Sequence, residues 1–362
     1  MSTASATGDD VSVPRRRPGL PDAVWSALGV LASLVFLAPL LALAGQPIWR
    51  GYDLLFSASF GSSADLSFLL LASTPLVLVG LGVALPLRAG MFNLGGEGQL
   101  LAGAIAAVWV ATQMSWADDL PLSFLIPLAA GALAGGAVGG VAGVLRAWRR
   151  VSEVVTTLML SFIVLLLGQY LVSGPLEVDN AVYPATDIVP IGFRLTGAGP
   201  DQLIRTGFVV AVIIAVGVWL LTQFTKMGWR QQLIGLNPKV AARQGISVGR
   251  EGTIALAIGG ALAGLGGAAE LLGNQLRVGY VFSPGWGWDA IVIALLARGN
   301  ALAVIPFALY FGFLRNGALV LQQELQVSPD LVLAMGGAPV ILVAAIIGYR
   351  SYKRFVAEPA PE

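Results

Sequence analysis

Long apolar segments recur along the whole chain, and they constrain the fold more than any other feature of the sequence. A helix needs about 20 apolar residues to cross the hydrocarbon core of a bilayer. Of the 362 residues, 56% are hydrophobic and only 11% are charged, whereas about a quarter are charged in soluble domains. We therefore predict an all-α, polytopic transmembrane helical bundle of about ten spans, at residues 24–44, 66–86, 92–113, 122–145, 153–173, 204–224, 252–273, 288–298, 301–321 and 330–348.

The eighth segment, 288–298, is too short to cross the bilayer alone. We predict a half-helix, continued by irregular backbone through Gly285 and Gly287. Such backbone is tolerated at membrane depth only where protein or a water-filled path surrounds it. The segment is therefore expected to lie inside the protein or along a path for a solute.

Two blocks of four predicted spans, about 66–173 and 252–348, have related layouts. Each block places an interrupted helix beside a Gly-rich segment, at 90–98 and at 279–289. An odd number of crossings separates the two starts, so the second block would run with inverted topology. Broken helices in inverted repeats are common in transporters, and we predict two such repeats here.

Lys and Arg residues gather in alternate connecting segments, which indicates the orientation. With the N-terminus in the cytoplasm, the external segments hold few of the 21 basic residues, namely Arg50, Arg194, Arg205 and Arg277. We predict cytoplasmic tails at 1–22 and 351–362, flanking a membrane domain at 23–350.

Glycines spaced four residues apart lie on one face of the segment 131–143, at Gly131, Gly135, Gly139 and Gly143. Small residues also fill 259–267. Such stripes allow helix backbones to approach closely. Plain helix packing is the favoured interpretation, and a sliding interface for conformational change is the alternative.

The sequence excludes or disfavours several classes of enzyme. It contains no Cys and no His. The absence of Cys excludes thiolate metal ligands, and the absence of His removes both the commonest metal ligand and the commonest general base. It also lacks a GxxxxGK[ST] phosphate-binding loop, so any ATP hydrolysis must come from another subunit. We predict no catalytic residue, no metal site and no cofactor bound by this chain. The net charge of +1 suggests no nucleic-acid partner.

A Gly-rich turn at 90–99 leads into a membrane helix and carries Asn93, Glu97 and Gln99. Polar side chains at such depth usually have a function. The simpler interpretation, which composition alone favours, is that Asn93 and Glu97 cap the start of the helix.

Further polar residues lie inside the predicted spans, at Glu270, Asp289, Arg315 and Asn316. A charge in the membrane needs a partner, and Glu270 or Asp289 is the candidate for Arg315. A structural ion pair and a polar lining for the solute path both remain open.

The loop 225–251 has the signals of a short cytosolic helix. Asn237 is a good N-cap, Pro238 suits the first helical position and Gly245 is a good C-terminal stop. We predict a helix over 239–244 with a basic, partly apolar surface.

Four segments, 92–99, 152–160, 285–291 and 314–318, together resemble the permease subunits of nucleoside and simple-sugar ATP-binding-cassette importers. Ribose-type and branched-chain amino-acid permeases belong to the same superfamily. Ser161 stands where Asn is usual, and Trp288 replaces the usual Phe. The resemblance implies a multi-pass protein of the bacterial plasma (inner) membrane with both termini cytoplasmic. It also implies alternating access and a nucleoside or simple sugar as the solute.

The resemblance further implies partners and roles. An ATPase subunit would use ATP and Mg²⁺, an identical or homologous second permease would complete the path, and an external lipoprotein would bind the solute. The ATPase would contact a coupling helix formed by Gly235, Asn237, Pro238, Lys239, Ala241, Ala242, Arg243 and Gly245. The solute path would be lined by Asn93, Glu97, Gln99, Glu270, Trp288, Asp289, Arg315 and Asn316.

The alternative is a secondary transporter driven by an ion gradient, with coupling through Glu97, Glu270 or Asp289. The defined cytoplasmic loop favours the ATP-driven importer, because a secondary transporter does not need it.

Overall fold

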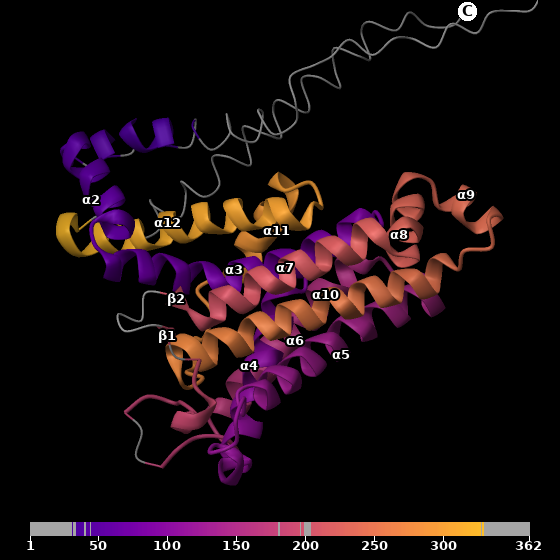
Figure 1. The fold of residues 1–362 in the computed structure, drawn as a ribbon, viewed down its shortest axis with the longest axis horizontal. Coiled ribbons are helices and arrows are strands. Elements are labelled where there is room, and N and C mark those ends of the chain that lie inside the picture. Colours follow the sequence, from indigo (N-terminus) through magenta and orange to yellow (C-terminus); the bar gives the residue numbers. More distant parts are fainter. Residues whose placement is uncertain are drawn as a thin grey trace, which may run out of the picture.

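The computed structural model describes residues 31–328 except 32–33, 40, 44, 180–181, 196, 199–203 and 327. This part of the chain is almost entirely helical (Figure 1). The main helices are α2 (Ile48–Phe60), α3 (Ser63–Arg88), α4 (Gly96–Gln113), α5 (Leu125–Arg149), α6 (Glu153–Val172), α7 (Thr206–Phe224), α8 (Lys226–Leu236), α9 (Pro238–Arg243), α10 (Val248–Glu270), α11 (Trp286–Leu296) and α12 (Ala301–Leu325).

Shorter elements complete the described part. Two 3₁₀ turns lie at Ser115–Ala117 and Ile191–Phe193, and a π-helical turn at Leu271–Gln275 extends α10. Strands β1 (Gly197–Ala198) and β2 (Ile204–Arg205) form one short antiparallel pair before α7. The predicted all-α class is confirmed.

Helices α3 and α10 form the centre of the bundle. Their most apolar stretches are 78% and 72% buried, whereas those of α6 and α7 are only 22% and 28% buried. A helix that is apolar on all sides needs cover on all sides. The central pair obtains it from the protein, while the outer helices expose broad apolar faces that suit lipid.

Helix α10 packs against α5 through backbone rather than side chains, and the two run side by side (Figure 1). A Cβ on Gly135 would overlap the carbonyl of Gly260 and lie 2.7 Å from the Cα of Gly264. A Cβ on Gly143 would lie 2.6 Å from the Cα of Thr253. The glycine stripe is therefore a helix-packing face, as the spacing predicts.

Six helices are long and apolar enough to span a membrane, at 63–88, 125–149, 153–172, 206–224, 248–275 and 301–325. Two shorter apolar helices, Leu34–Leu43 and Trp286–Leu296, accompany them. Helix α11 is the short helix predicted at 288–298. The predicted span 330–348, most of 24–44 and both predicted tails, 1–22 and 351–362, lie outside the described residues.

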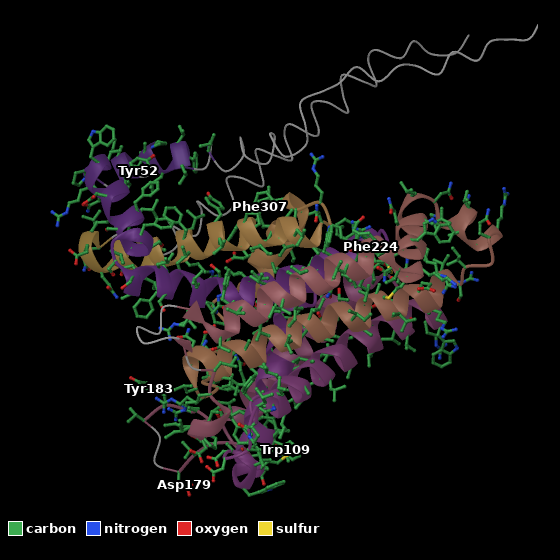
Figure 2. The ribbon with its side chains drawn as sticks, viewed as in Figure 1. Tyr52, Trp109, Asp179, Tyr183, Phe224 and Phe307 are labelled. Atoms are coloured by element: carbon green, nitrogen blue, oxygen red, sulfur yellow. The ribbon has the colours of Figure 1, made fainter. Side chains whose placement is uncertain are left out.

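Two helices have no counterpart among the predicted elements. Helix α2 lies where an external connection was expected, and the Tyr52 hydroxyl (Figure 2) donates to the Leu34 carbonyl at 2.5 Å. Helix α8 directly follows α7, with the Thr225 hydroxyl accepting from Gly228 N–H at 3.3 Å.

The bundle has two distinct ends. Helices α8 and α9 lie at one end (Figure 1), while Asp179 and Tyr183 of the α6–α7 loop lie at the other (Figure 2). That loop is held to the segment after α10 by backbone hydrogen bonds. Thr186 N–H donates to the Val278 carbonyl at 2.9 Å, and Val189 N–H to Leu276 at 2.8 Å. The α6–α7 loop and the segment after α10 are therefore held together at this end of the bundle.

Candidate functional site

The turn before α4 is fixed by two buried amides. Asn93 and Gln99 are fully buried, and their side chains bond each other at 2.9 and 3.0 Å. Asn93 also donates to the Gly82 carbonyl at 3.2 Å and accepts from Gly95 N–H at 3.1 Å. The prediction that Asn93 caps α4 is wrong, because Gly95 holds the N-cap position and α4 has no side-chain cap. The two amides use their hydrogen-bonding capacity to fix the turn.

Glu97 caps a helix other than its own. Its carboxylate accepts from the backbone N–H of Gly287 at 2.6 Å, although the two residues are 190 positions apart. Gly287 lies in the first turn of α11, where a negative charge is favourable. The prediction that Glu97 caps α4 is therefore wrong, because its carboxylate caps α11 instead. The N-termini of α4 and α11 meet at this bond.

Gly287 is required for this meeting to be so close. A Cβ at this position would lie 2.6 Å from the Cα of Glu97 and 2.7 Å from its carboxylate. The sequence-based expectation placed Gly287 in irregular backbone, but it is helical. Gly285 is the N-cap of α11 and has a φ of +99°, in the left-handed region that favours glycine.

Helix α6 supplies the remaining partners of the turn before α4. The Ser161 hydroxyl accepts from Gly98 N–H at 2.7 Å, and the Thr157 hydroxyl accepts from Leu94 N–H at 3.1 Å. The Gly98 N–H is one of the groups that the first turn of a helix leaves without a partner, whereas Leu94 lies in the turn before α4. Sequence reasoning assigned no role to Ser161. Its partner Gly98 is 63 residues away, so no local sequence pattern indicated the contact.

Arg315 pairs with Asp289. Its Nε and Nη2 lie 2.7 and 2.6 Å from Asp289 Oδ2, and Nη2 also donates to the Pro284 carbonyl at 3.2 Å. The two side chains are only 15% and 21% exposed. The expectation that Arg315 has an acidic partner is confirmed, and of the two candidates the structure selects Asp289. The pair links α11 to α12.

Glu270 ends α10 and is 1% exposed. Its Oε1 accepts from the Asn274 side chain at 2.6 Å and from Gln275 at 3.4 Å, while Oε2 has no hydrogen-bond partner among the described residues. Asn274 and Gln275 lie in the π-helical turn. π-helical turns are frequent at functional sites. Sequence reasoning missed both amides, although their polarity directly after an apolar span is a visible signal.

Arg315 joins these groups into one site. It is near enough to interact electrostatically with both Glu97 and Glu270. Asn316, its neighbour on α12, has a buried Nδ2 without a partner among the described residues. Trp288 on α11 is 45% exposed. The structure thus brings the acids and the arginine together, while Asn93 and Gln99 fix the turn that leads into the helix of Glu97.

The segment after α7 forms a second candidate region. Asn237 caps α9 by accepting from the N–H groups of Lys239 and Val240 at 3.0 and 3.2 Å. Gly245 follows with a φ of +76°. The predicted short helix and both of its end signals are therefore confirmed, and Pro238 holds the first helical position.

Helices α8 and α9 are anchored to the rest of the bundle. Ala241, Ile234 and Ile246 form a small buried cluster, and Arg230 pairs with Glu251 at 3.0 Å. Ala241 is fully buried, so the idea that it packs on another subunit is wrong. Lys239, Ala242 and Arg243 are exposed. Gly235 lies against the end of α3, where a Cβ would overlap the Arg88 carbonyl.

The family model described as "Branched-chain amino acid transport system / permease component" matches residues 66–344. The chain belongs to this permease family.

Similar proteins cover nearly the whole chain. A glucose ABC transporter permease protein of Haloferax volcanii is 33% identical over 92% of this chain and 91% of its own length. A guanosine ABC transporter permease protein of Bacillus subtilis is 32% identical over 89% of this chain and 93% of its own length. A nucleoside ABC transporter permease protein of Lactococcus lactis is 30% identical over 84% and 85%. No solved structure gives a significant match.

Family and fold together give the general role of the permease. It is a multi-pass membrane protein and the membrane subunit of an ATP-binding-cassette importer, not an enzyme. ATP hydrolysis belongs to a separate subunit, and the secondary-transporter alternative is not supported.

Proposed function

We propose that this permease carries nucleosides or related simple sugars into the cell by alternating access. The observation that carries the proposal is similarity over nearly the full length to permeases named for guanosine, nucleosides and glucose. Solutes of this class carry hydroxyl and amide-like groups. They require a path with spare hydrogen-bonding capacity rather than a fixed charge.

The polar site divides into residues that shape the path and residues that contact solute. Asn93, Gln99, Glu97 and the Asp289–Arg315 pair are engaged with protein partners. Within the described part of the chain, Glu270 and Asn316 keep buried polar atoms without partners, and an unpaired buried polar atom is costly. We assign solute contacts to Glu270, Asn316 and the half-exposed Trp288, and positioning roles to the others.

Helices α8 and α9 form the coupling element for the ATPase subunit, which uses ATP and Mg²⁺. Their exposed basic side chains, Lys239 and Arg243, suit acidic groups of that partner, and Ala242 offers a small contact surface. The cluster around Ala241 and the contact of Gly235 with the end of α3 support this role, because a transmitted pull needs a rigid attachment to the bundle. Asn237, Pro238 and Gly245 define the helix that carries the surface.

The membrane arrangement we propose has about ten spans in two inverted repeats, at 66–173 and 252–348, with the coupling loop 225–251 between them. Six long spans, α4, α11 and the helix Leu34–Leu43 are compatible with it, together with the sequence segment 330–348. The meeting of the α4 and α11 N-termini supports equivalent positions for these helices in the two repeats. Both termini, with tails 1–22 and 351–362, would lie in the cytoplasm of a bacterial inner-membrane protein.

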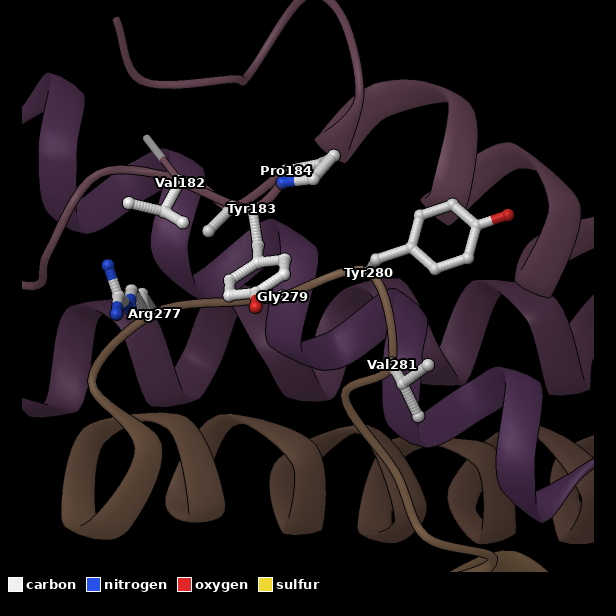
Figure 3. A pocket seen from close by; sticks show the side chains of 8 residues that line it. Val182, Tyr183, Pro184, Arg277, Gly279, Tyr280 and Val281 are labelled. Carbon is white, nitrogen blue, oxygen red and sulfur yellow. The ribbon is translucent and has the colours of Figure 1, made fainter. Parts of the chain in front are cut away.

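A second permease subunit, identical or homologous, would complete the path, and lipid would cover the rest of the bundle. An external solute-binding lipoprotein would dock at the end opposite α8 and α9. Tyr183, Arg277 and Tyr280 line an open pocket there (Figure 3). Tyr183 and Tyr280 are 79% and 51% exposed, and exposed tyrosines and arginines are typical of interfaces.

The test is reconstitution of the permease with its ATPase subunit, a second permease and the lipoprotein in vesicles containing MgATP. Uptake of radiolabelled guanosine and glucose is measured side by side. We expect ATP-dependent uptake of at least one, and none from vesicles that lack the ATPase. Accumulation on an ion gradient without the ATPase, or no uptake of either solute class, would contradict the proposal.

A further inference from the structure

A polar pocket at the α8–α9 end of the bundle has no place in the transport path described above. The residues that line it include Arg88, Gln223, Gln232, Gly235, Leu236 and Arg298. Three membrane helices reach it, because α3 and α7 end beside it and α12 begins there. The pocket therefore lies where the apolar spans give way to polar connections, at the depth of lipid headgroups.

The charge of the pocket is positive. Two arginines line it, and no acidic residue does so among the described residues. The start of α12 adds the positive end of a helix, whereas the C-terminal ends of α3, α7 and α8 add partial negative charge, so the positive charge of the pocket comes from the two arginines. A Cβ on Gly299 would lie 3.0 Å from Arg88 Cγ, so this helix start and Arg88 are in close contact.

Among the described residues, no carboxylate pairs with the partly buried guanidinium of Arg88. Its Nη2 donates to the Thr222 carbonyl at 3.4 Å, which is a long bond, and its buried Nε has no partner among the described residues. None of the ion pairs in the described part of the chain includes Arg88. By contrast, Arg146, Arg230 and Arg315 all have a carboxylate.

We propose that this pocket binds a phosphate group, supplied by the headgroup of an anionic phospholipid of the cytoplasmic leaflet. Guanidinium groups match phosphate geometry, and basic pockets between helix ends on the cytoplasmic side are suited to anionic headgroups. The amides of Gln223 and Gln232 and the start of α12 supply further donors. The proposal rests on the proposed orientation, which places this end in the cytoplasm.

The site also has a consequence for transport. Gly235 and Leu236, the end of α8, line the pocket together with Arg88. A bound headgroup would therefore touch the coupling element and the central helix α3 at the same time. An anionic lipid would stiffen the connection between them.

The test uses the full chain in a neutral detergent, with dioleoylphosphatidylglycerol, dioleoylphosphatidylcholine or inorganic phosphate added. Native mass spectrometry counts bound lipid, and thermal unfolding reports stabilisation. We expect phosphatidylglycerol to bind more tightly than phosphatidylcholine, and Arg88→Gln to weaken it about fivefold, as expected for loss of one basic residue near a lipid surface. Arg149→Gln is the matched control, because Arg149 lies at the end of α5 and stacks on Trp148.

Arg298→Gln provides a second variant at an exposed position and keeps the test decisive if Arg88→Gln folds poorly. If inorganic phosphate stabilises the protein, phosphatidylglycerol does not, and both variants lose this stabilisation, the pocket binds phosphate from a soluble ligand and the lipid assignment is wrong. Equal binding of the two lipids, or equal effects of Arg88→Gln and Arg149→Gln, would overturn the proposal. So would loss of the ATPase from purified Arg88→Gln complexes with unchanged lipid binding. Because lipid binding is measured without transport, its failure is separate from failure of the uptake assay.

Discussion

The Asp289–Arg315 pair should hold α11 to α12 in such a way that replacing either residue alone destabilises the protein. Replacing both together should add no further loss of stability. Asp289→Asn removes the negative charge that the guanidinium contacts at 2.6 Å, and Arg315→Met leaves the Asp289 carboxylate without its cation. Breaking a buried ion pair costs about 3–5 kcal/mol. Since these side chains keep 15% and 21% exposure, we expect about 2–3 kcal/mol for each single variant.

The double variant should be no less stable than either single variant, because neither charge is then left alone. This corresponds to a coupling energy of about 2 kcal/mol. Reversible unfolding in mixed SDS and detergent micelles, followed by circular dichroism, measures all three variants. Arg149→Met is the control, since Arg149 takes part in none of the ion pairs with carboxylates among the described residues.

The same double variant also tests the role of the pair. If the pair only positions helices, the double variant should recover ATP-dependent uptake together with stability. Single-variant losses that simply add in the double variant would refute this expectation. Recovered stability without recovered uptake would instead show that the pair contacts solute.

Three further outcomes follow from the packing and the surfaces. Gly287→Ala should lower the free energy of unfolding by about 1–3 kcal/mol, because the new Cβ would overlap the Glu97 backbone. Gly279→Ala is the neutral control, because no described atom lies within 4 Å of its Cβ. Gly264→Leu should separate α10 from α5 and lower the melting temperature, whereas Gly217→Leu on α7 meets open space and should not. Lys239→Glu combined with Arg243→Glu should reduce ATPase co-purification severalfold while melting stays unchanged. Normal ATPase recovery would remove α9 from the coupling surface.

Features set by neighbouring residues could be predicted from the sequence. The short helix α9 is an example, because its N-cap Asn237, Pro238 at its first position and Gly245 just after its end all lie within nine residues of sequence. The glycine stripe of α5 is another, since a four-residue spacing already defines a face. Helix α8 was missed because its apolar and polar residues do not form a membrane span, and its N-cap, Thr225, stands directly after α7.

Contacts between distant segments could not be predicted in the same way. Glu97 could be recognised as a buried acid, but only the fold shows that its partner is the N–H of Gly287. The Asn93–Gln99 amide pair closes across a turn whose shape no local rule supplies. Arg315 required an acidic partner on physical grounds, and the choice between two candidates depended on how α11 meets α12.

The bond between Glu97 and Gly287 imposes an order on biogenesis. Its two halves are 190 residues apart, and ribosomes add about 5–20 residues per second. A nascent chain must therefore hold the Glu97 carboxylate for roughly 10 to 40 seconds before α11 is synthesised. Throughout that interval the early helices are inserted while the Glu97 carboxylate lacks the Gly287 N–H. Water, lipid headgroups or an insertase must solvate the carboxylate until α11 is made.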